Sequence, residues 1–329
     1  MQIKSYLSAF LVSALFAVGF GFIIIPLLKK LKFGQSILNY VSEHNYKSGT
    51  PTMGGIIFIL SSTISFFFFS TKNKYLSIVC LVVGLSYMAV GFIDDFIKIK
   101  NKTNDGLSAL QKTLFELVIA VIISIFGVYR GLTKIYIPFT DKIIDLGYFF
   151  IPICIFLFLA TTNSVNLTDG LDGLAGGVSY LFFLSIGSLI LIQTTKFKGS
   201  YVYSSEYTNV ALLSFCLAGG IVGFLLFNTH KATVFMGDTG SLSLGGFIAI
   251  ISIITGNLLF IPIIGITYVL SSISVILQVI YFKRTKKRIF LMAPLHHHFQ
   301  HKGFDESKIG VGYKMATLFF GLICIIFYL

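Results

Sequence analysis

The chain has 329 residues, a net charge of +12 and a mean hydropathy of +0.88, with 55% hydrophobic but only 12% charged residues. A soluble domain carries about twice that share of charge, so the composition excludes an ordinary soluble protein and indicates an integral membrane protein. The basic residues lie in short loops between apolar runs. This position indicates that they orient the chain in a bilayer and attract anionic lipid or phosphate, and it argues against nucleic acid as the partner.

A membrane-spanning helix needs about 20 mostly apolar residues, and the chain contains about ten such runs. They predict an all-α integral membrane protein in which residues 1–329 form a single polytopic domain. Pro262, near the start of the ninth run, predicts that this helix is bent or broken. Short β-like runs in 132–146 predict a small external hairpin. The predicted spans lie near 5–28, 53–70, 75–93, 113–130, 147–163, 174–194, 208–227, 241–256, 258–282 and 310–328.

One set of loops carries most of the Lys and Arg, and such loops lie on the cytoplasmic side of a membrane. We therefore expect these loops to be cytoplasmic and both termini to be outside. All six histidines and most of the aspartates lie in the same loops. Because acidic residues contribute little to orientation, this clustering indicates one polar site at the cytoplasmic face. The loops are 29–52, 94–112, 164–173, 228–240 and 283–309.

Two adjacent carboxylates, Asp94 and Asp95, end the third predicted span. A helix C-terminus disfavours negative charge by about 0.3–1 kcal/mol per group, and the two carboxylates repel each other. Either Mg²⁺ or nearby lysines would compensate, and the simpler alternative is a solvated loop in which Lys98 is their partner. Neighbouring side chains on a helix point in different directions, so we expect the two aspartates to have different roles.

The loop 163–173 places small and polar residues between two long apolar runs, and its glycines let a ligand approach the backbone closely. Asp172 could instead cap the following helix. Capping does not explain why Asn166 and Asp169 lie in the same loop. This loop is therefore a candidate binding site.

The loop 228–241 has the same character, and Asp238 in it could also cap the helix that follows. Capping leaves Asn228 and Phe235 unexplained. An exposed Phe beside a Gly-Asp turn could stack on a nucleobase, although a Phe alone is more commonly a membrane-interface residue. The loop therefore predicts contacts to a nucleotide.

The loop after the ninth span is strongly basic and contains three consecutive histidines at 296–298. A basic juxtamembrane loop normally attracts anionic headgroups, whereas consecutive histidines could hold a transition metal or bind phosphate. The turn at 47–55 adds a lysine and hydroxyl groups. The chain has no GxxxxGK[ST] and no HExxH motif, which argues against an ATPase and against the commonest type of metalloprotease.

Together these clusters resemble the polyprenyl-phosphate N-acetylhexosamine-1-phosphate transferases, over about 47–304. An unbroken triple histidine and TPTMGG favour the branch with a muramoyl donor over the N-acetylglucosamine branch. The chain departs from the family pattern at His230-Lys231, Gln300, Phe304 and Gly312, where we expect local differences in the loops. The matching strings are GTPTMGG at 49–55, DDFIK at 94–98, NSVNLTDGLDGLAGG at 163–177, FNT at 227–229, VFMGDTGSLSLGG at 234–246 and MAPLHHHF at 292–299.

The resemblance implies Mg²⁺-dependent transfer of phospho-N-acetylmuramoyl-pentapeptide from UDP-N-acetylmuramoyl-pentapeptide to undecaprenyl phosphate, with release of UMP, at the bacterial inner membrane. The family also suggests a homodimer. The implied metal ligands are Asp238 with Asp169 and Asp94, and the implied catalytic residues are Asp94, Asp95, Lys112, Asp169, Asp238 and His297. The implied substrate-binding residues are Lys47, Thr52, Lys102, Asn166, Asp172, Asn228, Phe235, His296 and His298.

The role of Asp94 could be that of a base, a covalent nucleophile or a positioning group. The second pKa of a phosphomonoester is near 6, so the lipid phosphate is mostly a dianion at neutral pH and a base has little to remove. We therefore expect Asp94 to orient the lipid phosphate through a cation or a lysine. The polyprenyl tail needs a hydrophobic groove that opens to the bilayer, and a bent ninth span could provide it.

Two alternatives remain. An N-acetylglucosamine-1-phosphate transferase would use the same chemistry. A secondary transporter would also have many spans, but transporters usually hold ionisable groups near the bilayer midplane and often contain an inverted repeat. Here the carboxylates lie at span ends on one face and the two halves show no repeat, which favours the enzyme.

Overall fold

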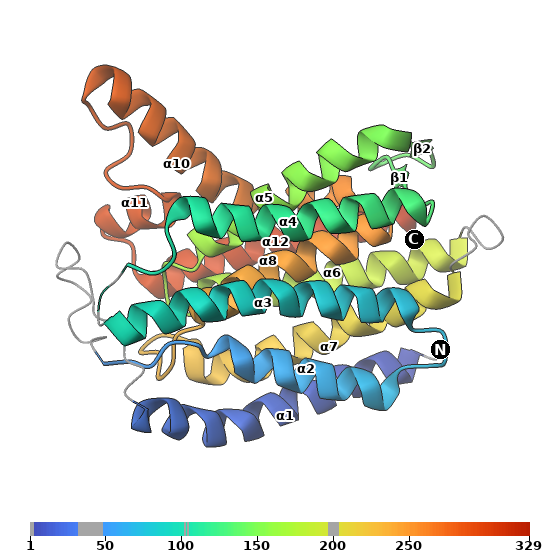
Figure 1. Ribbon diagram of the computed structural model, residues 1–329, viewed down its shortest axis with the longest axis horizontal. Helices are drawn as coiled ribbons and strands as arrows, with labels where there is room; N and C mark the ends of the chain where they lie inside the picture. Colours follow the sequence, from blue (N-terminus) through green and yellow to red (C-terminus); the bar gives the residue numbers. More distant parts are fainter. Residues whose placement is uncertain (1–2, 32–48, 102, 104, 197–203) are drawn as a thin grey trace.

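The computed structural model describes residues 3–31, 49–101, 103, 105–196 and 204–329, and within them the long helices form one bundle (Figure 1). The long helices are α1 (Ile3–Lys30), α2 (Gly55–Phe69), α3 (Tyr75–Asn101), α4 (Ala109–Tyr129), α5 (Phe150–Thr168), α6 (Leu174–Lys196), α7 (Ser204–Asn228), α8 (Gly237–Ile254), α10 (Ile266–Thr285) and α12 (Glu306–Tyr328). The short elements are β1 (Lys134–Tyr136), β2 (Ile143–Asp145), the 3₁₀ turns Gly147–Phe149 and Leu258–Phe260, α9 (Ile261–Ile264) and α11 (Leu295–His301).

Among the described residues, nine helices are long and apolar enough to cross a membrane, and α2 is a shorter apolar helix. Every predicted span coincides with one of these helices, so the prediction of an all-α integral membrane fold is confirmed. The exposed large side chains of α1, α4 and α12 are mostly apolar, as a lipid-facing surface requires because lipid tails offer no hydrogen bonds. The chain is a multi-pass membrane protein.

The predicted loop boundaries are wrong where polar residues continue a helix. α3 extends to Asn101, so Asp94 and Asp95 lie inside a helix and not in the loop after it. The lysines Lys98 and Lys100 in its last turn favour this extension, because cations are stabilising at a helix C-terminus. α5 likewise continues to Thr168, which places Asn166 on a helix.

The ninth span is broken, as predicted, but the break falls after the proline. Pro262 lies in the first turn of α9, where a proline fits because it lacks only an N–H that would have no helical partner. α9 ends at Gly265, which leaves helical geometry and begins α10. Figure 1 shows α10 leaning away from the bundle beyond this point.

The predicted hairpin in 132–146 is confirmed. β1 and β2 pair antiparallel, with Ile135 opposite Ile144. The hydroxyl of Tyr328, near the end of α12, donates to the carbonyl oxygens of Ile137 (3.2 Å) and Thr140 (3.0 Å) and ties the hairpin to the bundle. Figure 1 shows the hairpin at the same end of the bundle as both chain ends, while α11 lies at the opposite end.

α8 is the central helix and packs most extensively against α3 and α5. Glycines permit these close approaches: a Cβ on Gly91 of α3 would overlap the backbone carbonyl of Asp238, and one on Gly55 of α2 would overlap Gly240. The helix backbones therefore meet where α8 begins, and this fixes the position of Asp238.

Replacing Gly91 by alanine should destabilise the protein, although alanine is the better helix former. The new methyl group must displace the backbone at Asp238, and overpacking of this kind costs about 1–3 kcal/mol. We expect a lower unfolding temperature in detergent. Gly310→Ala in α12 is the matched control, because nothing lies within 4 Å of its Cβ position. Equal unfolding temperatures for the two variants would contradict this packing.

Candidate active site

Asp238, in the first turn of α8, accepts hydrogen bonds from three other helices. Its Oδ2 accepts from the Nζ atoms of Lys98 on α3 and Lys112 on α4, both at 2.9 Å. Its Oδ1 accepts from Nδ2 of Asn166 on α5 at 2.7 Å. The same amide group donates to Oγ of Ser241 at 2.8 Å. Lys112, Asn166 and Asp238, which were predicted from separate loops, therefore meet at one carboxylate.

Asp94 and Asp95 contact different partners, as expected for helix neighbours. Asp95 accepts from the backbone N–H groups of Asp238 (3.2 Å) and Thr239 (2.9 Å) and from the Thr239 hydroxyl (2.7 Å). It thus caps α8 from another helix and satisfies N–H groups that have no partner within α8. Asp94 forms an ion pair with Lys98 (2.6 Å) and accepts from the N–H of Leu107 (2.8 Å).

Two simpler interpretations of these aspartates are wrong. Asp94 and Asp95 are only 2% and 1% exposed, so they do not start a solvated loop, although Lys98 is the partner of Asp94. The capping interpretation of Asp238 also fails, because the N-cap residue of α8 is Met236 and it makes no side-chain cap. Asp94 and Asp95 are buried and Asp238 is half-buried, and all three are held by specific donors.

The arrangement could hold a divalent cation. Carboxylate oxygens of Asp94, Asp95 and Asp238 all lie within 4.8 Å of one another, and Mg²⁺ prefers oxygen ligands, usually one or two carboxylates with phosphates and waters. The carboxylate of Asp95 already accepts three hydrogen bonds from α8, so it is less available to a metal ion. Asp238 is held partly by flexible lysine side chains, which could transfer to phosphate, so it fits the role of principal ligand.

Asp169 follows the last residue of α5 and lies close enough to the other acids to sense their charge. Burial, together with the negative charges of Asp238, Asp95 and Asp172, raises the pKa of Asp169 from 3.8 to about 8. A carboxyl group in such surroundings is stabilised by a cation. The acids whose ligand atoms lie within 4.8 Å of one another are Asp94, Asp95 and Asp238, so Asp169 is not part of this closest-spaced set and its metal-binding role stays a prediction.

The histidine helix α11 covers the loop that follows α5. The Nε2 atoms of His296 and His297 both lie where a side chain on Gly170 would be, next to Asp169. His296 is fully buried, and both of its ring nitrogens lack a hydrogen-bond partner among the described residues. Burial and the neighbouring His297 lower the pKa of His296 to about 3. Its imidazole is therefore neutral and could donate to, or accept from, a bound substrate.

His298 lies differently. Its Nδ1 accepts from the backbone N–H of Leu291 at 3.1 Å, and its ring packs edge-on against Phe290. These contacts stabilise the loop between α10 and α11. The structure thus brings two of the three predicted histidines to Asp169, and the third supports the loop before them.

The turn at 49–55 is joined to the loop before α8 by backbone hydrogen bonds. The N–H of Phe235 donates to the carbonyl of Pro51, and the N–H of Gly54 donates to the carbonyl of Phe235, each at 2.8 Å. Thr52 is buried, and its hydroxyl lies with the Asp95 carboxylate around Gly237. The predicted residue Thr52 therefore lies beside the acids. Phe235 is half-buried.

Asn228 and Asp172 shape the same region. Asn228 donates from Nδ2 to the carbonyl of Val234 at 3.0 Å. Asp172 accepts from the N–H of Ala232 at 3.1 Å and links the two polar loops. It also lies with His230 and Glu306 in a second cluster whose potential ligand atoms are within 4.8 Å of one another. The remaining predicted residues, Lys47 and Lys102, lie outside the described residues.

Sequence reasoning missed the second contact of Lys98 and missed Glu116 altogether. Lys98 stands four residues after Asp94, the spacing of an ion pair on a helix, but the sequence could not show that it also reaches Asp238. Glu116 is a lone acid in the apolar run of α4, and an acid within a membrane-spanning helix is itself a signal of function. The structure shows it fully buried one turn after Lys112.

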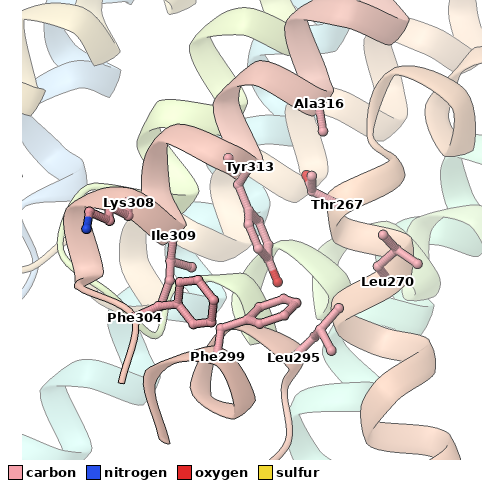
Figure 2. Close-up of a pocket in the computed structure, with 10 residues that line it drawn as sticks. Thr267, Leu270, Leu295, Phe299, Phe304, Lys308, Ile309, Tyr313 and Ala316 are labelled. Carbon is pink, nitrogen blue, oxygen red and sulfur yellow. The ribbon is translucent and has the colours of Figure 1, made fainter. Parts of the chain in front are cut away.

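An apolar cavity of about 490 Å³ lies between α10, α11 and α12 (Figure 2). Figure 2 shows Tyr313 pointing into this space, with its hydroxyl directed toward Phe299. The ring of Tyr313 is 6.3 Å from that of His296, so the cavity reaches the histidine helix. It is lined by Thr267, Leu270, Leu295, Phe299, Phe304, Lys308, Ile309, Gly312, Tyr313 and Ala316.

Comparison with known proteins gives the family. A profile of glycosyl transferase family 4 matches residues 76–256, and phospho-N-acetylmuramoyl-pentapeptide-transferase signature 1 matches residues 47–59. Over 319 residues, or 96% of both chains, this chain is 43% identical to the phospho-N-acetylmuramoyl-pentapeptide-transferase of Thermoanaerobacter sp. (strain X514) and 44% identical to that of Caldanaerobacter subterraneus subsp. tengcongensis. A protein of the same name from Clostridium botulinum (strain Alaska E43 / Type E3) is 41% identical over 324 residues, 97% of this chain and 94% of its own.

The fold is that of a multi-pass membrane protein, and the matched family and relatives identify an enzyme that transfers phosphate-containing groups. The chain belongs to glycosyl transferase family 4 and, within it, to the phospho-N-acetylmuramoyl-pentapeptide transferases. The resemblance inferred from the motifs is confirmed.

Replacing Asp169 by asparagine should reduce the pH dependence of stability. Because the pKa of Asp169 is raised from 3.8 to about 8 in the folded state, its contribution is present below the ordinary pKa and is lost as the pH rises to about 8. With EDTA present, the unfolding temperature of the unmutated protein should fall relative to that of Asp169→Asn between about pH 5 and pH 8. A constant difference over this range, measured in detergent, would contradict the assigned environment.

Proposed function

We propose that this chain transfers phospho-N-acetylmuramoyl-pentapeptide from its uridine diphosphate derivative to undecaprenyl phosphate and releases UMP, at the cytoplasmic face of the bacterial inner membrane. The names of its relatives support this reaction. The observation that carries the proposal is the convergence of Asp94, Lys98, Lys112 and Asp238 at one end of the bundle. An attack by one phosphate on another needs such a site, because negative charge must be neutralised.

Asp238 is the principal metal ligand in this proposal, with Asp94 and Asp169 beside it. Mg²⁺, when bound, neutralises charge on the phosphoryl oxygens. Lys98 and Lys112 lie 2.9 Å from the Asp238 carboxylate, so their ammonium groups can reach phosphates bound next to it. They would hold the diphosphate of the donor and stabilise UMP as it leaves.

Asp94 acts as a positioning group. It forms a 2.6 Å ion pair with Lys98 and accepts from the N–H of Leu107, so it fixes the ammonium of Lys98 and the start of the α3–α4 connection. The lipid phosphate is already mostly a dianion at neutral pH. Little of the lipid phosphate still carries a proton that Asp94 could remove. The contribution of Asp94 is to orient the ammonium of Lys98 toward the incoming phosphate.

The polyprenyl chain would enter the apolar cavity between α10, α11 and α12. The cavity has the chemistry of an isoprenoid site, because its lining is almost wholly apolar and Lys308 is its one charged side chain. It approaches His296 through Tyr313, which would place the lipid phosphate near the acids. The lean of α10 after Gly265 separates it from the bundle and suits a site entered from the bilayer (Figure 1).

The nucleotide end of the donor would occupy the polar loops. Phe235 is half-buried and follows Val234, whose carbonyl accepts a hydrogen bond from Asn228, and a base can stack on such a ring. Asp172, Thr52 and Asn166 border the same region, and Lys47 and Lys102 are further candidates. His296, His297 and His298 would contact phosphate or sugar, directly or, for His298, through the loop that it holds.

The purified protein should release UMP only when UDP-N-acetylmuramoyl-pentapeptide, undecaprenyl phosphate and Mg²⁺ are all present. Asp238→Asn should lower the rate by at least about 10³-fold, because the variant lacks the negative charge that would bind the metal and that attracts both lysines. The control is Asp141→Asn, in the turn between β1 and β2, where Asp141 forms an ion pair with Lys196. Figure 1 shows this hairpin at the opposite end of the bundle from α11. Release with UDP-N-acetylglucosamine but not with the muramoyl donor would select the alternative transferase. No release with either donor would reject the proposal.

Asp94→Asn should lower the rate by about 10²-fold at every pH, because a misplaced Lys98 weakens alignment of the phosphates. A general base would behave differently: the variant would recover at high pH, where the lipid is fully ionised. The pH–rate profile of the variant between about pH 6 and pH 9 separates the two roles. Recovery at the alkaline end would reject the positioning role.

A further inference from the structure

Glu116 is a fully buried carboxylate in the membrane helix α4 that the proposed mechanism does not use. Its Oε2 accepts from Oγ1 of Thr162 at 2.7 Å and from Nδ2 of Asn163 at 3.1 Å, both on α5. Its Oε1 is buried and has no hydrogen-bond partner among the described residues. A buried acidic oxygen without a partner is costly, and an acid inside a membrane helix generally marks function.

Glu116 lies directly behind the contacts of Asp238. It follows Lys112 by four residues, so the two side chains share one face of α4. On α5, Thr162 precedes Asn166 by the same interval. Glu116 therefore joins α4 to α5 one helical turn, about 5.4 Å, deeper than the level at which Lys112 and Asn166 both reach Asp238.

Charge connects Glu116 to Lys112 as well. The two lie close enough to attract each other, while the ammonium of Lys112 donates to Asp238 Oδ2, the oxygen that Lys98 also contacts. A divalent cation that binds Asp238 must compete with these ammonium groups for that oxygen. An anion beside Lys112 with a free oxygen would receive the displaced ammonium.

We propose that Glu116 is a positioning residue that serves as the alternate partner of Lys112 and so frees Asp238 Oδ2 for a divalent cation. In one arrangement Lys112 contacts Asp238, and in the other it turns back along α4 to Oε1 of Glu116. The bonds from Thr162 and Asn163 hold Glu116 in place during the exchange. This inference rests on the proposed function, because it assumes that Asp238 binds a metal.

The test is a titration of the detergent-solubilised protein with Mn²⁺, followed by electron paramagnetic resonance without substrates. Glu116→Gln should require about tenfold more Mn²⁺ for half-saturation, because a unit charge one turn away has an effect of at least this size at an interior dielectric constant of about 20. Thr162→Val is the matched control, because it removes one hydrogen bond and leaves the charge. It should stay within about twofold of the unmutated protein.

A double-mutant cycle separates the exchange from simple attraction between Glu116 and the cation. Lys112→Met alone should tighten Mn²⁺ binding, because it removes a competitor. Adding Glu116→Gln to Lys112→Met should then weaken Mn²⁺ binding clearly less than Glu116→Gln does in the unmutated protein, because only the direct attraction between Glu116 and the cation is left to lose. An equal loss of affinity in both backgrounds would overturn the proposal. A purely structural role would also overturn it: Mn²⁺ binding would then be unchanged in Glu116→Gln, and the unfolding temperature would fall equally in Glu116→Gln and Thr162→Val.

Lys112→Met keeps the proposal testable if Glu116→Gln does not fold, because weaker or unchanged Mn²⁺ binding in that variant would also overturn it. The outcome is independent of the catalytic assay. An unmutated protein that binds Mn²⁺ but releases no UMP would reject the proposed function and leave the role of Glu116 to be decided by the titration.

Discussion

The site depends on the carboxylate of Asp95, which binds the N-terminus of α8. Two backbone N–H groups and one hydroxyl of α8 donate to it, and it is 1% exposed. In a membrane bundle these N–H groups have little water to satisfy them, so the bond is costly to break. One turn before Asp95, Gly91 brings the two helix backbones into contact. Asp238 is therefore presented to α4 and α5 by a rigid junction.

Two lysines offset part of the negative charge around this junction, and the acids outnumber them. Lys98 bridges Asp94 and Asp238, and Lys112 adds a second cation to Asp238. Two ammonium groups on one oxygen form a mobile arrangement, because a lysine can exchange one anion for another at little geometric cost. A substrate that carries phosphates and arrives with a divalent cation offers that exchange. The same two lysines thus stabilise Asp238 when no substrate is bound and can contact the phosphates of a bound substrate.

Much of the fold could be predicted because membrane spans are set by length and composition. The hairpin and the break in the ninth span were also predictable, since β-rich runs and a proline are local signals. The ends of α3 and α5 were not, because polar residues at the aqueous end of a span do not by themselves end a helix. The break fell at Gly265 and not at Pro262 because a proline suits the first turn of a helix.

The site was predicted only in part, because motifs are local and the contacts that complete the site are not. Motifs identified Asp94, Asp95 and Asp238 as a group, but only three-dimensional packing shows that Asp95 caps α8. Glu116 and the second contact of Lys98 were missed because they depend on contacts across helices, at Thr162 and Asp238. A run of three histidines likewise cannot reveal which ring turns to the loop backbone.

The central claim is that the buried acids form one divalent-cation site at Asp238. Anomalous diffraction from crystals soaked in Mn²⁺ tests it most directly, because the scattering locates the ion without reference to activity. The account predicts a peak within about 2.5 Å of an oxygen of Asp238, the range of metal–carboxylate distances. A peak only at the cluster of Asp172, His230 and Glu306, or none near Asp238 at saturating Mn²⁺, would contradict it.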